Sequence, residues 1–523
     1  MTGKEINRNM KRRNEFIAFS TGVLLALTYP PFKSGFIAYI GLIPLFYLME
    51  SERGRRGFRL GYLWGLGFNL AMLYWIIWAT IPGGVAAVLF LPLYSAVLFY
   101  IIFYSYKKIG RKSLYIFPFF WTASEYLRSQ GVLGFPWTSI AYTQTYYAPL
   151  IQYASITSAY GVSFWVCYLN VLFYFFFQNL HNTEKIIKYV IVIILVFTIP
   201  FIYGMLVIGK GEFLNENRKI KVSMIQANID PDVKWDEKFK NSNFSTYEKL
   251  TFRAAKEKPD IIIWPETAAT CYLRLPQAVK YRRWVESIVN KTETPLITGT
   301  LDYKYVPEIN EYRAFNSAVY FEPGKRNFED YAKIKLVPFG ERVPFEEYLK
   351  FLKDIDMGQG DFYPGNEEKV FILPLKNAPR DNILFSVVIC FESIFPDLFR
   401  KFCYNGAEFA IVITNDCWFG KTSAPFQHAQ ISIFRAIENR IGIARNANTG
   451  VSMIIDPYGR VNISTPIFKQ RIITGKVYLR NNITFYTKYG DVFSYCVIMV
   501  SAMALIEIVF IVEMKKNKNE INL

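Results

Sequence analysis

The chain has 523 residues, of which 52% are hydrophobic and 18% aromatic, and its formal net charge is +17. This length suits two or three domains, and the clustered apolar residues favour a membrane protein over a nucleic-acid-binding one, since much of the positive charge lies in short loops between apolar stretches. Six cysteines without a CxxC pair and only two histidines, His181 and His428, argue against a metal centre or a disulfide scaffold, so we expect no metal and no cofactor.

Eight apolar stretches approach the length of about 20 residues that a membrane-spanning helix needs. They lie near residues 15–31, 35–50, 60–81, 84–106, 113–127, 162–180, 187–208 and 492–513. The second and fifth are short. We do not expect the first to be a cleaved signal peptide, because further spans follow it and it shows no small-residue cleavage site.

Basic residues gather in every second loop, which predicts the orientation of the spans. The basic loops are the N-terminus, the loops near 51–59, 107–112 and 182–188, and the tail after residue 513. Both termini are then cytoplasmic. This predicts seven helices within 1–210 with an outer loop near 128–160, an extracytoplasmic domain over 211–490, an eighth helix over 491–513 and a cytoplasmic tail over 514–523. Buried core helices of a soluble protein would not produce this alternation.

The outer loop contains GVLGFPWTSIAYTQ at residues 131–144. Glycine, proline and aromatic residues near a membrane fit a re-entrant or interfacial segment, and they fit an ordinary surface loop equally well.

Residues after Gly211 have the pattern of an α/β domain. Alternating or solid apolar runs predict strands, and helical patterns separate them. Strands are expected at 219–228, 259–267, 314–323, 382–390 and 408–416, and helices at 241–258, 276–290, 394–404 and 424–440.

Three polar residues lie at or near the ends of strands in this domain: Glu266, Lys333 and Cys390. A cysteine between a buried strand and a helix N-terminus is placed where the helix dipole favours a thiolate. A carboxylate can take a thiol proton, and an ammonium can stabilise developing negative charge. Taken singly, each has a structural explanation. Glu266 could be a simple cap, Lys333 a solvated strand lysine and Cys390 a small core residue.

The motifs around these residues resemble the nitrilase superfamily. They are WPET around Glu266, YAKIKLVPFGE around Lys333, VVICFES around Cys390, and the downstream segments NDCWFG and QHAQISIFRAIENRIGIARNANTG. The resemblance implies an αββα sandwich with a Glu–Lys–Cys triad. Lys333 is at the family position, eight residues before the glutamate of FGE, whereas Lys335 falls where relatives commonly have histidine.

Nearly the whole chain, with helices on both sides of this domain and the segments PDVKWDE and GFPW, resembles the apolipoprotein N-acyltransferase family. The expected fold is therefore a multi-pass α-helical membrane domain plus a nitrilase-like αββα sandwich. The resemblance implies transfer of a fatty acyl chain from a membrane phospholipid to the α-amino group of a diacylglyceryl-cysteine apolipoprotein, through a thioester on Cys390. It also implies a bacterial inner membrane with the catalytic domain on the periplasmic side, no nucleic-acid partner and a monomer.

The same resemblance suggests further site residues. Glu341 and Glu392 would support the triad, and the Phe391 backbone N–H would contact the oxyanion, although Phe391 replaces a residue that is often tyrosine in relatives. Trp235, Trp418 and Phe339 are candidates for substrate binding, and Trp235 could instead rest on lipid. Asn415 and Asp416 are expected to shape the pocket wall, and His428 to be structural.

Two other functions remain possible on the sequence. One is a membrane-tethered nitrilase-type amidase, for which a single tethering helix would suffice. The other is a non-catalytic membrane scaffold, against which the complete Glu266, Lys333 and Cys390 set argues. Residues 339–366 have the spacing of an amphipathic helix followed by a glycine-rich loop, which predicts either an interfacial gate or a packed surface helix.

Overall fold

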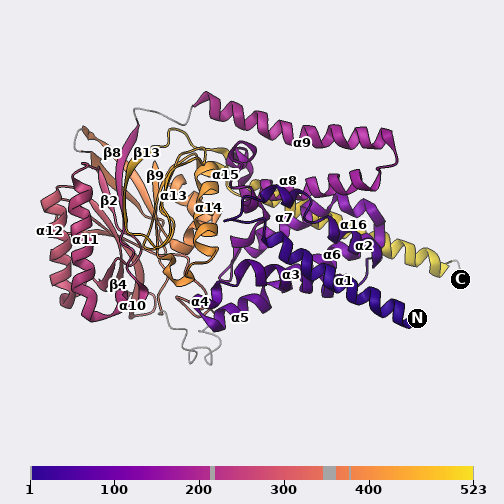
Figure 1. Cartoon of the computed structure of the whole chain (residues 1–523), viewed down its shortest axis with the longest axis horizontal. Coiled ribbons are helices and arrows are strands. Elements are labelled where there is room, and N and C mark those ends of the chain that lie inside the picture. Colours follow the sequence, from indigo (N-terminus) through magenta and orange to yellow (C-terminus); the bar gives the residue numbers. More distant parts are fainter. Residues whose placement is uncertain (1–2, 53, 212–217, 345–360, 376–377, 522–523) are drawn as a thin grey trace. The chain divides into compact units, whose positions relative to one another are not determined.

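The computed structural model describes residues 3–52, 54–211, 218–344, 361–375 and 378–521. It divides into two compact units (Figure 1). The membrane unit comprises Met1–Ile77, Ile81–Leu206 and Asp491–Leu523, and the α/β unit comprises Trp78–Thr80 and Val207–Gly490. The proposed gate falls largely on residues 345–360, which lie outside the described residues.

The helices before and after the α/β strands follow most of the predicted spans. They are α1 (Gly3–Ala26), α2 (Ile43–Ser51), α3 (Gly57–Leu73), α4 (Ile76–Ala79), α5 (Ile81–Phe90), α6 (Pro92–Ile109), α7 (Phe117–Arg128), α8 (Ala154–Gln178), α9 (Thr183–Lys210) and α16 (Val492–Ile521). Within the described residues, four segments are long and apolar enough to cross a membrane: Ile81–Tyr115, Ala154–Gln178, Thr183–Lys210 and Val492–Phe510. The chain is therefore a multi-pass membrane protein.

Four predicted spans differ from the helices found. The span at 35–50 holds the 3₁₀ turn η1 (Gly35–Tyr39) followed by the nine-residue helix α2. The span at 60–81 is wrong at its end, because α3 stops at Leu73 and a separate short helix α4 follows. The stretch at 84–106 contains two helices, and Pro92 begins the second one, where its missing N–H costs no helical hydrogen bond. The span at 113–127 corresponds to α7, which has only 12 residues.

Glycines allow the helices of the membrane unit to pack closely. A Cβ at Gly22 on α1 would lie 2.1 Å from the Trp64 carbonyl oxygen on α3, and one at Gly61 on α3 would lie 2.5 Å from that of Ser95 on α6. Such contacts are shorter than any side chain permits, so the α1–α3 and α3–α6 pairs depend on these glycines.

The segment at 131–144 folds into the 3₁₀ turns η3 (Pro136–Thr138) and η4 (Ile140–Gln144), which are buried. The buried carboxylate of Glu125 on α7 holds it, accepting hydrogen bonds from Ile140 N at 2.8 Å and Ser139 Oγ at 2.7 Å. Trp121 Nε1 and Ser163 Oγ donate to the same carboxylate at 3.0 and 2.6 Å. Burial of this kind favours a packed segment over an ordinary surface loop.

Two sheets form the centre of the α/β unit. The first has the order β13–β1–β2–β4–β5–β6, with β3 paired to β4, and the second has the order β12–β11–β10–β9–β8–β7. The first comprises β1 (Lys219–Gln226), β2 (Ile261–Ile263), β3 (Ala269–Tyr272), β4 (Leu296–Val306), β5 (Glu311–Phe321), β6 (Glu329–Ala332) and β13 (Arg471–Tyr478). The second comprises β7 (Val370–Leu375), β8 (Ala378–Ile389), β9 (Phe409–Thr414), β10 (Gly442–Ala447), β11 (Met453–Ile455) and β12 (Val461–Ser464).

Helices cover the outer faces of both sheets, which confirms the αββα sandwich. Figure 1 shows α11 (Lys240–Ala255) and α12 (Val279–Thr292) on one side, and α13 (Pro396–Tyr404) and α14 (Ala424–Asn439) on the other. These four helices confirm the predictions to within a few residues at their ends. Strands β1–β2, β2–β4, β8–β9 and β9–β10 pair in parallel, so Glu266 and Cys390 follow strands in the parallel parts of the sheets. Lys333 instead follows β6, which pairs antiparallel with β5.

Trp264 connects the core to the candidate site, because Pro265 and Glu266 follow it directly. Its indole is fully buried and stacks on Tyr247 of α11 with ring centroids 4.7 Å apart. The Nε1 group donates to Thr251 Oγ1 at 2.9 Å. A buried indole with a satisfied N–H fixes the position of the chain that follows.

Candidate active site

Cys390 is the first residue after β8 and begins the 3₁₀ turn η9 (Cys390–Ile394). Its φ of +52° is left-handed. A non-glycine residue in this region is strained unless its surroundings hold it, and such strain is concentrated at functional sites. The backbone therefore turns sharply at the sulfur-bearing residue.

Glu392 holds this turn from within. Its fully buried carboxylate accepts hydrogen bonds from Ile389 N at 2.8 Å, Ile334 N at 2.6 Å and the Tyr331 hydroxyl at 2.6 Å. Burial raises the pKa of Glu392 to about 7, although these hydrogen bonds oppose the shift. Glu392 thus joins the Cys390 turn to the segment that carries Lys333.

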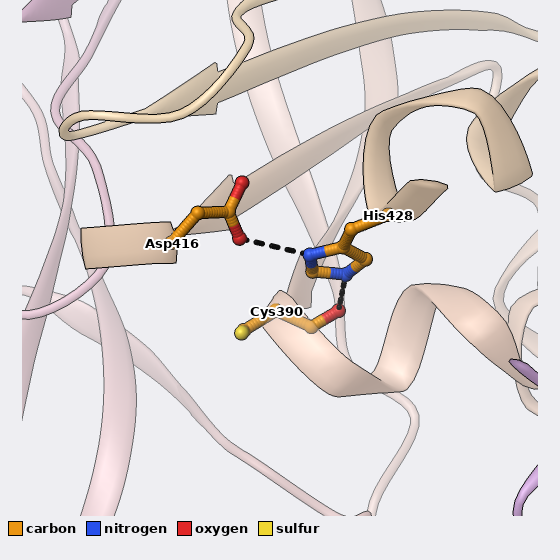
Figure 2. Close-up of side chains that lie close together, drawn as sticks. All are labelled: Cys390, Asp416 and His428. Carbon is orange, nitrogen blue, oxygen red and sulfur yellow. Dashed lines mark hydrogen bonds and ion pairs between the residues drawn. The ribbon is translucent and has the colours of Figure 1, made fainter. Parts of the chain in front are cut away.

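His428 and Asp416 hold the turn from the other side (Figure 2). His428 Nε2 lies 3.1 Å from the Cys390 carbonyl oxygen and Nδ1 lies 2.9 Å from Asp416 Oδ1. The ligand atoms of Cys390, Asp416 and His428 lie within 4.8 Å of one another, a spacing that could hold a metal ion. Both ring nitrogens are already engaged, and Asp416 also pairs with Arg445 at 3.1 Å, so a hydrogen-bond network fits these residues better than a metal centre.

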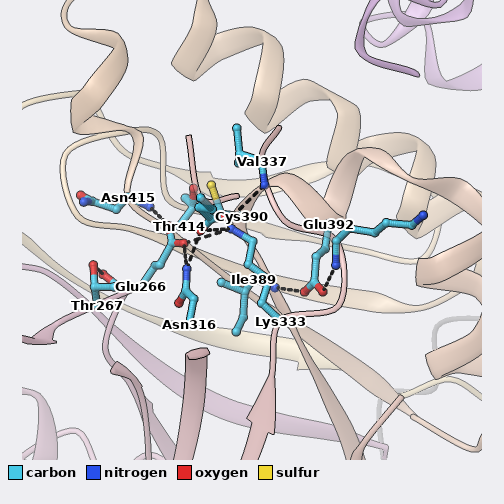
Figure 3. A network of polar contacts seen from close by, with 12 residues as sticks. Glu266, Thr267, Asn316, Lys333, Val337, Ile389, Cys390, Glu392, Thr414 and Asn415 are labelled. Carbon is cyan, nitrogen blue, oxygen red and sulfur yellow. Dashed lines mark hydrogen bonds and ion pairs between the residues drawn. The ribbon is translucent and has the colours of Figure 1, made fainter. Parts of the chain in front are cut away.

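Glu266, Lys333 and Cys390 come together in the α/β unit (Figure 3). Lys333 Nζ lies 3.4 Å from Glu266 Oε1 and 2.8 Å from Glu341 Oε1. Asn316 on β5 donates from Nδ2 to both carboxylates, at 2.9 and 2.8 Å. The Asn415 backbone N–H donates to the other Glu266 oxygen at 2.8 Å. Two carboxylates, one ammonium and one amide therefore form one buried hydrogen-bonded cluster, and the charges of Glu266 and Lys333 act on the Cys390 thiol.

The electrostatics of this cluster follow from its burial. Burial disfavours the Lys333 ammonium, but the carboxylates of Glu341 and Glu266 outweigh it and raise the pKa of Lys333 above its usual value. Burial and the nearby Glu266 charge raise the pKa of Cys390 well above its ordinary value, although Lys333 opposes them. Burial therefore outweighs the dipole of the five-residue 3₁₀ turn, which would favour a thiolate.

Lys234 is a second buried lysine at this site. It lies in the short helix α10 (Pro231–Trp235), and its Nζ donates to the Glu266 carbonyl oxygen at 3.1 Å and to Thr267 Oγ1 at 2.6 Å. Opposite this turn, a Cβ at Gly299 would lie 2.5 Å from Glu266 Cα, so the position must be glycine. The Glu266 backbone is thus clamped between Lys234 and β4.

Lys234 should make the stability of the folded protein depend on pH, and removing its amine should abolish that dependence. Burial lowers its pKa from 10.5 to about 8, so the fold favours the neutral amine and its contribution to stability rises as the pH increases from 8 towards 10.5. The full change is on the order of 3 kcal/mol. We expect the melting temperature of the wild type, relative to that of Lys234→Met, to increase between pH 7.5 and 10 in detergent. The exposed Lys238→Met should show no such trend, and a constant difference for Lys234→Met would contradict the assignment.

The remaining predicted residues differ in how far their side chains are buried. Phe391 is 6% exposed and its ring packs edge-on against Phe395. Phe339 and Trp418 are half-buried, and Trp235 is 41% exposed on α10, next to Lys234. Asn415 was predicted to shape the pocket wall. Its backbone N–H also donates a hydrogen bond directly to Glu266.

Asn316 and Lys234 were missed in the sequence. Asn316 lies mid-strand in AFNSAVYF, where a single buried asparagine among apolar residues is a detectable signal. Lys234 sits among charged residues in PDVKWDE and is indistinguishable there from a solvated lysine.

Comparisons with known proteins show the family to which the chain belongs. Residues 21–172 match the apolipoprotein N-acyltransferase N-terminal domain, and residues 221–481 match the carbon-nitrogen hydrolase domain. The apolipoprotein N-acyltransferase of Geobacter metallireducens is 34% identical over 94% of each chain. That of Chlorobaculum tepidum is 33% identical over 94% of this chain and 96% of its own.

Among solved structures, Saccharomyces cerevisiae Nit3, a member of branch 10 of the nitrilase superfamily, matches with a TM-score of 0.38 and 18% identity, covering 51% of this chain and 92% of that one. Because two full-length relatives exceed 30% identity, this chain belongs to the apolipoprotein N-acyltransferase family of the nitrilase superfamily.

Proposed function

We propose that the protein transfers a fatty acyl chain from a membrane phospholipid to the α-amino group of a diacylglyceryl-cysteine apolipoprotein, through a thioester on Cys390. The observation that carries this proposal is the buried cluster in which a carboxylate and an ammonium flank the thiol (Figure 3). A thiol nucleophile with an adjacent base forms acyl-enzyme intermediates.

In the first half-reaction, Glu266 takes the Cys390 proton as the sulfur attacks the ester carbonyl of the phospholipid. Proton transfer accompanies attack because the raised pKa keeps the resting sulfur protonated. The oxyanion is stabilised by the Lys333 ammonium and by the Phe391 backbone N–H. The carbon–oxygen bond then breaks, the proton on Glu266 passes to the departing alkoxide, and a lysophospholipid leaves.

In the second half-reaction, the free amine of the apolipoprotein attacks the thioester carbonyl. Glu266 accepts the amine proton, the carbon–sulfur bond breaks, and the proton returns to Cys390. The product is an amide, and the enzyme is regenerated without a cofactor. Glu341, Glu392 and Asn316 act by positioning the three reacting groups, through the hydrogen bonds given above. Trp235, Trp418 and Phe339 are proposed to contact substrate.

The location follows from the same proposal. Both substrates carry acyl chains, so an enzyme with several membrane-spanning helices fits them better than a soluble amidase. The alternation of basic loops supports cytoplasmic termini and a periplasmic catalytic domain in the bacterial inner membrane. We propose that the enzyme acts as a monomer.

Intact-protein mass spectrometry after incubation with phospholipid tests the intermediate. We expect the full-length wild type to gain the mass of one acyl chain, and addition of a diacylglyceryl peptide to remove it. Cys390→Ala should gain nothing. Cys403→Ala is the matched control because Cys403 is fully buried in the same unit, and it should behave as the wild type.

Two outcomes would contradict the proposal. An acyl adduct that persists in Cys390→Ala would place the intermediate elsewhere. Release of free fatty acid alone, with no acylated peptide, would indicate a membrane-tethered hydrolase.

A further inference from the structure

A buried chain of polar side chains runs behind the Cys390 turn, and neither half-reaction proposed above uses it. Its members are Arg445 on β10, Asp416 at the start of the 3₁₀ turn η10 (Asp416–Phe419), His428 on α14 and Ser393 on η9, and all four are fully buried. Arg445 Nη2 pairs with Asp416 Oδ2 at 3.1 Å, and His428 Nδ1 lies 2.9 Å from Asp416 Oδ1. Burying such groups is costly, so a chain that ends at the nucleophile points to a role there.

The protons of this chain follow from its partners. Burial raises the pKa of Asp416, but its contacts with His428 and Arg445 outweigh burial and hold that pKa below its usual value. Asp416 is therefore a carboxylate, and His428 Nδ1 donates to it. Burial and the Arg445 charge lower the pKa of His428, although Asp416 opposes them, so near neutral pH Nε2 is an acceptor.

The Ser393 hydroxyl joins His428 to the backbone of the nucleophile. Its Oγ lies 3.0 Å from His428 Nε2 and 2.8 Å from the Cys390 carbonyl oxygen, to which it donates. Nε2 itself lies 3.1 Å from the same carbonyl oxygen. The imidazole, the hydroxyl and the carbonyl thus form one compact group, in which the hydroxyl proton has two acceptors within reach.

The Cys390 carbonyl belongs to the same peptide group as the Phe391 N–H, the proposed donor to the oxyanion. This peptide is planar and trans, so its N–H points opposite to its C=O. Figure 2 shows the carbonyl turned towards His428 and the Cys390 sulfur turned away from the ring. Holding the carbonyl on one side therefore sets the direction of the N–H on the other.

The turn needs such a contact after the cysteine. Cys390 has a φ of +52°, a conformation that persists only where its surroundings hold it. Glu392 anchors the chain before the cysteine, whereas Ser393 and His428 contact the peptide that follows it. These two contacts are separate from the Glu266–Lys333 cluster.

We propose that His428 is a positioning residue that aims the Phe391 N–H at the oxyanion. It acts through the Ser393 hydroxyl and the Cys390 carbonyl, and Asp416 fixes its orientation. The inference rests on the proposed acyl transfer at Cys390 and adds a residue to it. A donor that is already aimed needs no reorganisation when the charge develops, and hydrogen bonding at the carbonyl polarises the N–H of the same peptide.

Two variants of His428 distinguish this role from a merely structural one. A glutamine amide reaches the position of Nε2 and can still bond to Ser393, whereas an asparagine amide reaches only the position of Nδ1 and bonds to Asp416. In single-turnover acylation of the full-length enzyme by saturating phosphatidylethanolamine in detergent, we expect His428→Asn to be about 10- to 100-fold slower, since misalignment costs less than loss of a donor. His428→Gln should be faster than His428→Asn. The KM for the lipid should stay unchanged.

Iodoacetamide provides a reaction of the same sulfur without an oxyanion. The sulfur–carbon bond forms as the carbon–iodine bond breaks, and iodide and the thiol proton leave. Cys390 is partly exposed, and mass spectrometry of the peptide that contains it follows the rate. This rate should be equal in the wild type and both His428 variants. His181→Asn, which changes the exposed second histidine of the chain, should match the wild type in both reactions.

Three results would overturn the inference. Equal slowing of acylation and alkylation in His428→Asn would mean that the whole turn is disturbed. An asparagine variant that acylates as fast as the glutamine variant would assign His428 to Asp416 alone. Acylation of Ser393→Ala at the wild-type rate would show that the carbonyl contact does not matter, and this small change decides the question even if His428→Asn fails to fold. A wild type that forms no acyl adduct would instead reject the proposed function, and the inference with it.

Discussion

Glu266→Gln is expected to slow both half-reactions strongly, because in the proposed mechanism this carboxylate takes the proton from the thiol and then from the incoming amine. General-base catalysis contributes about 10²- to 10⁴-fold, so each step should slow by at least that range. The amide cannot take a proton, and wherever its NH₂ group points it meets a donor: Asn316 Nδ2 and Lys333 Nζ on one side, or the Asn415 N–H on the other. This mismatch should also cost about 1–3 kcal/mol of stability.

Single-turnover measurements separate the two steps. Acyl-enzyme formation is followed with phospholipid alone, and its discharge with diacylglyceryl peptide added to a preformed acyl-enzyme. The control Glu257→Gln removes a carboxylate from the same unit whose side chain is 63% exposed, and it should leave both rates unchanged. An acyl-enzyme that forms at the wild-type rate in Glu266→Gln would assign the base to another group.

The sequence predicted the site residues that follow strands, but it did not predict the other buried residues that contact them. Glu266 and Cys390 follow solid apolar runs, and strand ends in α/β sheets are where polar residues gather, so their proximity was a geometric expectation. Asn316 and Lys234 complete the cluster from a mid-strand position and from a short helix rich in charged residues. Their roles depend on which strands are neighbours, and a single sequence does not encode that order locally.

The state of the thiol could not be predicted for a related reason. A helix N-terminus lowers a thiol pKa, but burial raises it, and burial at Cys390 arises from chain segments far away in sequence. In the membrane unit, hydropathy located the long helices but not the breaks within them. The end of α3 at Leu73 falls within the apolar run LAMLYWIIWA at residues 70–79, so tertiary packing and not composition decides it.

Lys333→Met should lose both activity and stability, and the two losses should have different causes. Activity falls by about 10²- to 10³-fold, as when one donor to an oxyanion is removed. Stability falls by about 3–5 kcal/mol, because Glu266 and Glu341 are 6% and 7% exposed and would face each other without a cation. Thermal unfolding in detergent and steady-state acyl transfer measure the two effects on the same preparation.

The double variant Lys333→Met/Glu341→Gln separates the causes. Removing the second carboxylate relieves the repulsion, so much of the lost stability should return, whereas the oxyanion still lacks its ammonium and activity should stay low. Glu341→Gln alone keeps Lys333 beside Glu266 and should retain more activity than either variant that lacks the lysine. If the double variant regained activity together with stability, Lys333 would serve only to neutralise the buried carboxylates, and the charge on the oxyanion would be stabilised by other groups.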